Sequence, residues 1–152
     1  MVAKVRHLLS FVPEAGRPKA ESVLSVTLPN SSRIIALPGT ADTIRGFSGC
    51  NLLVVDEVGW LPESVYIAVR PMIAVSGGSM IVLSTPNGRS GWSYDAWEDG
   101  DGWDRTKVTY LDMPRIPRDR IESEKSHMTE AAFAQEHLCE FIALQGAVFD
   151  PG

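Results

Sequence analysis

At 152 residues, with 44% apolar and 22% charged residues, the chain has the size and composition of one ordinary globular domain. It has no apolar run long enough to cross a membrane and no basic-then-apolar leader, so we expect a cytosolic protein without membrane contact. A net charge of −5 argues against a surface that is basic all over. Cys50 and Cys139 show no CxxC spacing, so neither a zinc site nor a disulfide framework is predicted.

The N-terminal part of the chain carries signals for a helix, a hairpin and a loop. Residues 1–12 have apolar side chains at helical spacing and predict the end of a helix. Ser22–Leu28 and Arg33–Leu37 flank the letters PNSS and predict a β-hairpin, with Asn30 in the left-handed turn position. The glycine-bearing stretch that follows, up to Gly49, is predicted to be a loop.

The middle of the chain carries the strongest pattern. The apolar segment Leu52–Asp56 predicts a strand, Pro62 suits the first turn of a helix, and Glu63–Ile73 has apolar residues at helical spacing. A second continuous apolar strand is predicted over Met80–Ser84. Two apolar strands separated by a helix are typical of a βαβ unit in a parallel sheet that is covered on both faces, so the predicted fold class is α/β.

Shorter elements are predicted in the remainder of the chain. Pro117 and Thr129 suit helix starts, and the closing letters QGAVFDPG are typical of a linker. In chain order, the sequence predicts a helix over 92–97, a strand over 106–111, helices over about 117–126 and 129–137, and a strand over 139–144.

Polar residues follow both apolar strands. Asp56 and Glu57 end the first strand, and Ser84 and Thr85 end the second. Because the carboxyl ends of parallel strands form the ligand crevice of an open sheet, both motifs are predicted to face one site. Adjacent carboxylates repel each other unless a cation is present, and Mg²⁺ near Asp56, bound directly or through water, would leave Glu57 to orient or deprotonate a water. This is the chemistry of nucleoside triphosphate hydrolysis; the alternative, in which Asp56 caps the next turn and Glu57 is solvated, stays open.

The turn after the second strand contains two hydroxyls, a rigid proline and a permissive Asn-Gly pair. Its residues are Ser84, Thr85, Pro86, Asn87 and Gly88. The hydroxyls are candidates for sensing a γ-phosphate or holding the attacking water, and an ordinary turn is the alternative. Arg45 is a candidate phosphate contact, on its own or a neighbouring subunit, and Arg89 is placed similarly; a structural salt bridge is the alternative for both.

Four segments together resemble the large terminase subunit of tailed bacteriophages. LLVVDEVGWL resembles its Walker B strand, and STPNGRSGWSYDAW resembles its coupling motif. TIRGFSG, Thr43–Gly49, is similar to the segment just before Walker B, and FAQEHLCEF, Phe133–Phe141, is similar to the segment that closes the ATPase domain. The four segments follow the family's order over roughly residues 22–145.

The resemblance implies a P-loop NTPase-like domain of the RecA/ASCE type that hydrolyses ATP with Mg²⁺. Asp56 would be the magnesium-associated acid, Glu57 the catalytic carboxylate and Ser84–Gly88 the coupling motif. It further implies that ATP hydrolysis drives viral DNA into the procapsid, in the cytoplasm of the bacterial host. The implied partners are double-stranded viral DNA, the portal, the small terminase subunit and further copies in a homo-oligomeric ring.

The sequence departs from the family at one motif. The P-loop, GxxxxGK[ST], is absent; GTADTIRG has Gly39 and Gly46 but no lysine after them. Without this loop we expect the chain alone to bind ATP poorly or not at all. We therefore expect residues 1–145 to be a partial ATPase domain and 146–152 to start a linker to a missing nuclease domain, as in a fragment or a prophage remnant. The alternatives are a non-catalytic assembly or binding remnant and a fragment of a helicase-like ATPase.

Overall fold

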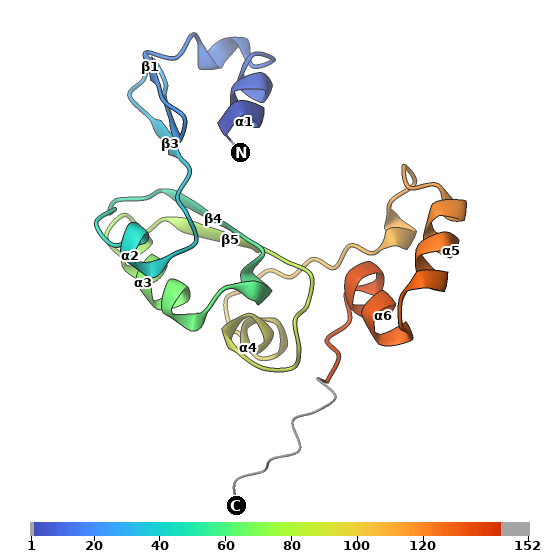
Figure 1. Ribbon diagram of the computed structural model, residues 1–152. Helices are drawn as coiled ribbons and strands as arrows, with labels where there is room; N and C mark the ends of the chain where they lie inside the picture. Colours follow the sequence, from blue (N-terminus) through green and yellow to red (C-terminus); the bar gives the residue numbers. More distant parts are fainter. Residues whose placement is uncertain (1, 144–152) are drawn as a thin grey trace, which may run out of the picture. The chain divides into compact units, whose positions relative to one another are not determined.

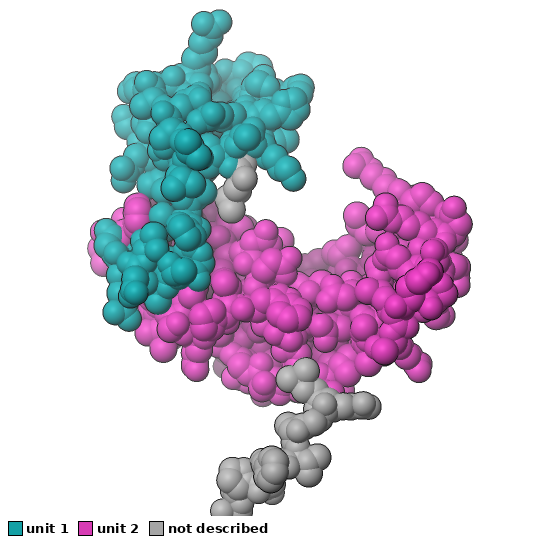
Figure 2. Space-filling model, viewed as in Figure 1, with its two compact units in different colours: residues 1–46 teal, residues 47–152 magenta. Residues whose placement is uncertain are grey.

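The computed structural model describes residues 2–143, which form two compact units (Figures 1 and 2). The first unit runs to Gly46 and the second begins at Phe47. Within residues 2–143, every helix is too short or too polar to cross a membrane. The predicted linker 146–152 lies outside the described residues.

The first unit combines a helix with a small antiparallel sheet. In chain order its elements are α1 (Val2–Leu9), η1 (Pro13–Ala15), β1 (Ala20–Glu21), β2 (Ser25–Thr27), β3 (Arg33–Ile35) and α2 (Ala41–Ile44). Strand β2 lies between the other two, with Val26 opposite Glu21 on one side and Ile34 on the other. Val26 is fully buried, so the central strand supplies the core of this sheet.

The predicted hairpin is confirmed as β2 and β3, although both strands are shorter than predicted. Strand β1 and helix α2 were not predicted. The prediction for Asn30 is wrong, because Ser31 is the residue with positive φ, at 68°. The Asn30 side chain instead accepts a hydrogen bond from the Ser32 N–H at 2.9 Å, the usual way in which asparagine stabilises a turn.

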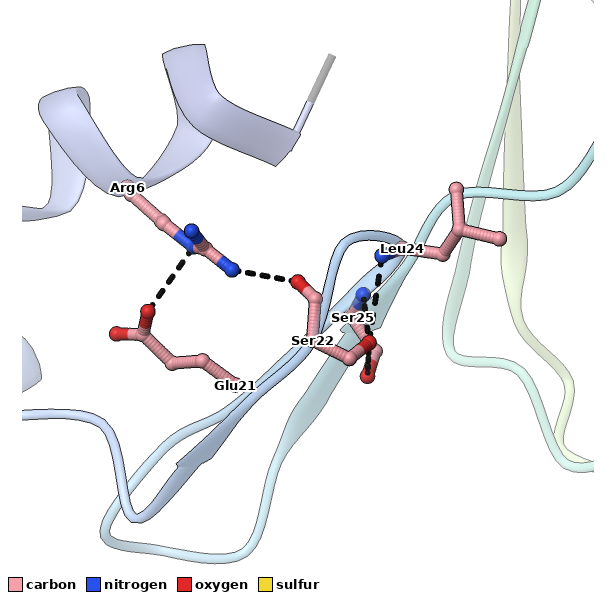
Figure 3. Close-up of polar contacts among 5 residues, drawn as sticks. All are labelled: Arg6, Glu21, Ser22, Leu24 and Ser25. Carbon is pink, nitrogen blue, oxygen red and sulfur yellow. Dashed lines mark hydrogen bonds and ion pairs between the residues drawn. The ribbon is translucent and has the colours of Figure 1, made fainter.

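One arginine joins helix α1 to the turn between β1 and β2 (Figure 3). Arg6 Nε lies 3.0 Å from Glu21 Oε2, and its Nη2 donates to the Ser22 carbonyl oxygen. The Ser22 hydroxyl oxygen in turn accepts from the backbone N–H groups of Leu24 and Ser25, at 3.3 and 3.0 Å. The Arg6 side chain of α1 and the Ser22 side chain of the turn itself thus hold this turn, in which Val23 and Leu24 are exposed.

The second unit contains the predicted βαβ arrangement. Its elements are β4 (Leu52–Asp56), η2 (Val58–Trp60), α3 (Glu63–Ala74), β5 (Ser79–Leu83), α4 (Trp92–Glu98), η3 (Tyr110–Asp112), α5 (Arg118–His127) and α6 (Glu130–Leu138). Strands β4 and β5 pair in parallel, from Leu52 opposite Ser79 to Asp56 opposite Leu83 (Figure 1). The parallel α/β prediction is therefore confirmed.

Helix α3 connects the two strands and buries one side. Its buried residues are Val65, Ala68, Val69 and Met72. They follow the i, i+3, i+4, i+7 spacing of one helix face, which explains why the apolar pattern located this helix within one residue. Pro62 occupies the N-cap position, where its lack of an N–H has no cost.

Polar contacts fix the start of the strand pair. The Cys50 N–H donates to the Met72 carbonyl at the end of α3, and the Ser76 hydroxyl donates to the Cys50 carbonyl. Ser79 N–H donates to the Asn51 carbonyl at 2.9 Å. Gly78 faces these backbone atoms so closely that a Cβ there would overlap the Cys50 carbonyl oxygen. These close contacts between backbone atoms therefore fix the register in which the two strands begin.

The prediction that both sheet faces are covered is wrong for the described residues. Alternate residues of β4 and β5 are about half exposed, with Val54 at 54% and its partner Ile81 at 47%, whereas Val55 is buried. The apolar character of both faces nevertheless made the strands recognisable. One face of the pair carries the buried Val55 and the half-buried Leu53, Met80 and Val82, and the other presents apolar side chains to solvent.

The two strands predicted toward the end of the chain are also wrong. Residues 106–109 form no strand and lead into η3, where Thr109 N–H and hydroxyl both donate to Asp112 Oδ2 at 2.8 Å. Residues 139–143 form no strand either, because Cys139 has φ 51° and ends α6. Helices α5 and α6 match their predictions, and they pack around the buried residues Ile121 and Phe133.

Candidate functional site at the strand ends

The two predicted motifs lie at the same edge of the sheet. Asp56 is the last residue of β4 and pairs with Leu83, the last residue of β5. Glu57 and Ser84 are consequently the first residues beyond each strand. The geometric prediction, that the acidic pair and the hydroxyl-bearing turn end neighbouring parallel strands, is confirmed by this register.

Glu57 adopts an unusual backbone conformation directly after the strand. Its φ and ψ are 54° and 40°, in the left-handed region that residues other than glycine seldom occupy. Its N–H is bound by Asp56 Oδ1 at 3.1 Å, and its carbonyl accepts from Trp60 N–H at 3.0 Å. Glu57 therefore begins the turn that contains η2, and Asp56 and Glu57 are both exposed.

The Asp56 side chain makes one hydrogen bond at the strand end, and its role as a magnesium ligand stays a prediction. One carboxylate oxygen accepts the N–H of Glu57, which is the next residue and not a donor inside the following turn, so η2 starts without a side-chain cap. The exposed carboxylate keeps its other oxygen for a further ligand, as the cation interpretation requires. This hydrogen bond and a further ligand are compatible, because a carboxylate has lone pairs for both.

The loop after Glu57 and the turn after β5 are joined through Gly59. Gly59 N–H donates to the Ser84 hydroxyl oxygen at 3.0 Å, and the Gly59 carbonyl accepts from Asn87 Nδ2 at 2.9 Å. A Cβ on Gly59 would lie 3.0 Å from both Ser84 Oγ and the Thr85 carbonyl. We call this arrangement of Gly59, Ser84 and Asn87 the strand-end clasp.

A hollow of about 290 Å³ lies beside the clasp. Gly59, Ser84 and Thr85 form part of its wall, together with Trp97 of α4 and with Lys107 and Phe141. Neither Asp56 nor Glu57 lines it. The exposed acids and this mostly apolar hollow are thus separate features of the same sheet edge. The prediction of a site for nucleoside triphosphate hydrolysis applies to the acids and not to the hollow.

The two candidate arginines differ in their surroundings. Arg89 Nε donates to the Phe141 carbonyl at 2.8 Å, so it ties the turn after β5 to the segment after α6. The Phe141 ring packs edge-on against Tyr94 of α4, at 5.1 Å between centroids. Arg45 belongs to the first unit, where it is the exposed C-cap of α2, and its phosphate contact stays a prediction.

Sequence reasoning missed Gly59 and the amide contact of Asn87. A hydrogen bond between residues 28 positions apart depends on the tertiary fold, so the pattern of the sequence does not contain it. The signal that was present is a glycine three residues after Asp56, opposite a turn rich in hydrogen-bonding side chains. Glycine at such a place indicates a close backbone approach.

A parallel strand pair joined by a helix thus places the Asp-Glu pair and the hydroxyl-bearing turn at one edge of a mixed α/β domain. The fold agrees with solved structures of the large terminase ATPase domain of Thermus phage P74-26. One of them aligns over 93% of this chain and 69% of its own, with a TM-score of 0.64 and 19% identity. In another, the TM-score is 0.62 and the identity 20% over the same coverage.

The family follows from the sequence itself. The family model described as "Terminase large subunit, T4likevirus-type, N-terminal" matches residues 1–151. The chain therefore belongs to the large terminase subunit family, within its N-terminal ATPase region. No curated protein matches the sequence.

Proposed function

We propose that the chain supplies the hydrolytic strand ends of a phage DNA-packaging ATPase, in which ATP hydrolysis drives viral DNA into the procapsid. The observation that carries this proposal is the register of β4 and β5, which brings Asp56, Glu57 and the turn Ser84–Gly88 to one edge. Family membership supports the same conclusion.

In the proposed reaction, Glu57 acts on the attacking water. Its exposed carboxylate accepts a proton as the water oxygen bonds to the γ-phosphorus, and the bond from that phosphorus to the bridging oxygen breaks, giving ADP and phosphate. The left-handed backbone at Glu57 determines where this carboxylate projects from the strand end. The hydroxyl of Thr85, at the neighbouring strand end, is our candidate for contacting the γ-phosphate.

Asp56 is the residue that would hold Mg²⁺, directly or through water. No group of three or more His, Cys, Asp or Glu residues gathers within residues 2–143. Mg²⁺ is commonly bound by one or two carboxylates together with water and substrate phosphates. The exposed carboxylate of Asp56 has the required hard oxygen donor. When bound, the cation neutralises charge on the phosphate oxygens.

The phosphates need a cradle that these residues do not supply. The sequence has no GxxxxGK[ST] motif. We propose that a P-loop outside these 152 residues, on the same polypeptide or on a partner, binds the β- and γ-phosphates. In the working motor we expect a homo-oligomeric ring, the portal, the small terminase subunit and double-stranded DNA as partners, in the cytoplasm of the bacterial host.

The half-exposed apolar side chains of the sheet favour a second candidate function. Leu52, Val54, Ile81 and Leu83 are between 47% and 54% exposed. A chain with such a face could act without catalysis, as an assembly module that associates with a P-loop-bearing partner over this face. In that case the acids would contribute nothing to turnover.

One experiment separates the two candidates. Phosphate release from Mg²⁺-ATP is measured for the chain alone and for the chain mixed with a P-loop-bearing polypeptide encoded beside it. We expect turnover only in the mixture, and we expect Glu57→Gln to lower kcat by at least about 100-fold, as loss of a general base does. Glu98→Gln, an exposed change on α4, is the control and should keep full turnover.

Two results would contradict the proposal. Full turnover with Glu57→Gln would remove this residue from the reaction and favour the assembly module. Hydrolysis by the chain alone would show that a P-loop is not required.

A further inference from the structure

The turn after β5 holds both polar backbone groups of one residue in the loop that follows Glu57. Ser84 Oγ accepts the Gly59 N–H and Asn87 Nδ2 donates to the Gly59 carbonyl, at 3.0 and 2.9 Å. Ser84 is exposed and Asn87 is partly buried, so two side chains from one turn reach a backbone segment 25 to 28 residues earlier. Neither bond involves a carboxylate.

Gly59 belongs to the same turn as Glu57. Trp60 N–H donates to the Glu57 carbonyl, which closes a four-residue turn with Gly59 as its third member. Any displacement of Gly59 therefore changes the geometry of the turn that Glu57 begins. Glu57 is the member with positive φ, at 54°.

The close fit around Gly59 leaves little room for that displacement. An added Cβ would lie 3.0 Å from Ser84 Oγ and from the Thr85 carbonyl, and 3.3 Å from Asn87 Cβ. Hydrogen bonds and packing thus act on the same residue. A left-handed glutamate persists only where its surroundings determine its conformation, and the clasp supplies such surroundings.

We propose that Ser84 and Asn87 are positioning residues that act through Gly59 to hold Glu57 in its left-handed conformation. The clasp does not touch the nucleotide. It sets the direction in which the Glu57 carboxylate leaves the strand end, and through Ser84 and Asn87 this direction depends on the turn after β5. The inference rests on the proposed function only for its consequence in catalysis, because the conformational link can be measured without ATP.

The decisive test is a double-mutant cycle in the free energy of unfolding of the chain. Glu57→Gly relieves the left-handed strain, and this gain exists only while the clasp imposes that conformation. We expect Glu57→Gly to raise the folded-to-unfolded ratio about fivefold more in the wild-type background than in Asn87→Ala. Glycine also raises the conformational entropy of the unfolded chain, but this effect is the same in both backgrounds and cancels in the comparison.

Asn51→Ala is the matched control background. Asn51 precedes β4 at the opposite end of the strand, and its side chain has no hydrogen-bond partner among the described residues. There the full gain of Glu57→Gly is expected. An equal gain in the Asn87→Ala and Asn51→Ala backgrounds would overturn the proposal.

A second measurement covers the case in which Asn87→Ala does not fold. Asn87→Asp keeps the shape but replaces the Nδ2 donor with an oxygen, and Ser84→Ala removes the acceptor of the Gly59 N–H. Amide exchange followed by NMR should speed up at Gly59 by about tenfold or more in Ser84→Ala, since its partner is lost. Ser84→Thr, which keeps the hydroxyl, should restore protection.

The amide of Ser79, bound to the Asn51 carbonyl, is the internal reference. Equal acceleration at Ser79 and Gly59 would indicate general destabilisation and overturn the proposal.

In the mixture that hydrolyses ATP, Asn87→Asp should lower kcat about tenfold with KM unchanged, because the clasp directs Glu57 without touching ATP. A rise in KM with kcat unchanged would place Asn87 on the nucleotide instead. If the mixture shows no turnover, the double-mutant cycle and the amide exchange rates still test whether the clasp holds Glu57 in its left-handed conformation.

Discussion

Glu57 is the described residue in which backbone conformation and proposed chemistry meet most directly. Its φ of 54° belongs to a region that costs a residue with a side chain about 1–2 kcal/mol. Three hydrogen bonds stabilise the turn that contains it: Glu57 N–H to Asp56 Oδ1, Trp60 N–H to the Glu57 carbonyl, and Gly59 N–H to Ser84 Oγ. Ser31 and Cys139 share the conformation, so the angle alone does not identify a site. At Glu57 it coincides with a strand end and a neighbouring acid.

Asp112 links the fold to pH. Backbone N–H and hydroxyl donation by Thr109 to the Asp112 carboxylate lower the pKa of this group below its usual 3.8. A depressed pKa in the folded state stabilises the protein above about pH 3.8, and the contribution is lost as pH falls through the lower folded pKa. We therefore expect the stability advantage of the wild type over Asp112→Asn to shrink as pH falls below 3.8.

Urea unfolding midpoints measured at a series of pH values check this prediction. Asp101→Asn is the control, since Asp101 lies in an exposed turn without a hydrogen-bond partner among the described residues. An advantage over Asp112→Asn that stays constant from pH 6 to the acid limit would contradict the assigned role of Thr109.

At the scale of elements, α6 begins at a side-chain cap. Thr129 Oγ1 accepts the Ala132 N–H at 3.2 Å, which satisfies one free donor of the first turn. We expect Thr129→Ala to lower the free energy of unfolding by about 1 kcal/mol, and Thr129→Ser to restore most of it. Chemical denaturation measures both changes. Equal stability of the alanine and serine variants would show that the cap bond contributes nothing.

The helices and strands that were predicted correctly are marked by residues within or next to them in the sequence. Helices α5 and α6 follow Pro117 and Thr129, and β4 and β5 are continuous apolar runs. The strand predicted over 106–111 does not form, although Val108 and Tyr110 alternate with polar residues as in a strand. A strand also needs a neighbouring strand to pair with, and the chain instead turns from Thr109 to Asp112. The strand predicted after α6 does not form, because Cys139 takes a left-handed conformation there. No local sequence pattern predicts that conformation.

The candidate site was predictable to a similar degree. A general rule for parallel strands placed Asp56 and Ser84 at one edge, and the register of β4 and β5 agrees. The clasp on Gly59 was not predictable, because hydrogen bonds between distant segments follow from tertiary packing. The roles of the acids, the turn and Arg45 stay predictions that only activity measurements can test.

At the scale of the whole molecule, the chain divides into two compact units near Gly46. The boundary segment 47–50 has no regular structure, and Phe47 is 38% exposed. Exposed segments between compact units are preferred sites of proteolysis. We expect limited chymotrypsin digestion to cleave after Phe47 and to yield fragments 1–47 and 48–152, identified by mass spectrometry.

The variant Phe47→Ala should abolish this fragment pair while leaving cleavage at the exposed Phe11 unchanged. If wild-type chain is cut within β4 or α3 before any product ending at Phe47 accumulates, the boundary is less accessible than the second unit. That result would contradict the division into independently compact parts.

Gly78 has a consequence for how this sequence can diverge. The space next to it is filled by the carbonyl oxygens of Cys50 and Asn51, so even a methyl group would force the two strand starts apart. The constraint is one of volume and not of backbone conformation, because Gly78 is not among the glycines with positive φ. In natural populations, codon changes at this position are therefore expected to be synonymous, while the neighbouring exposed Ser79 can drift among amino acids.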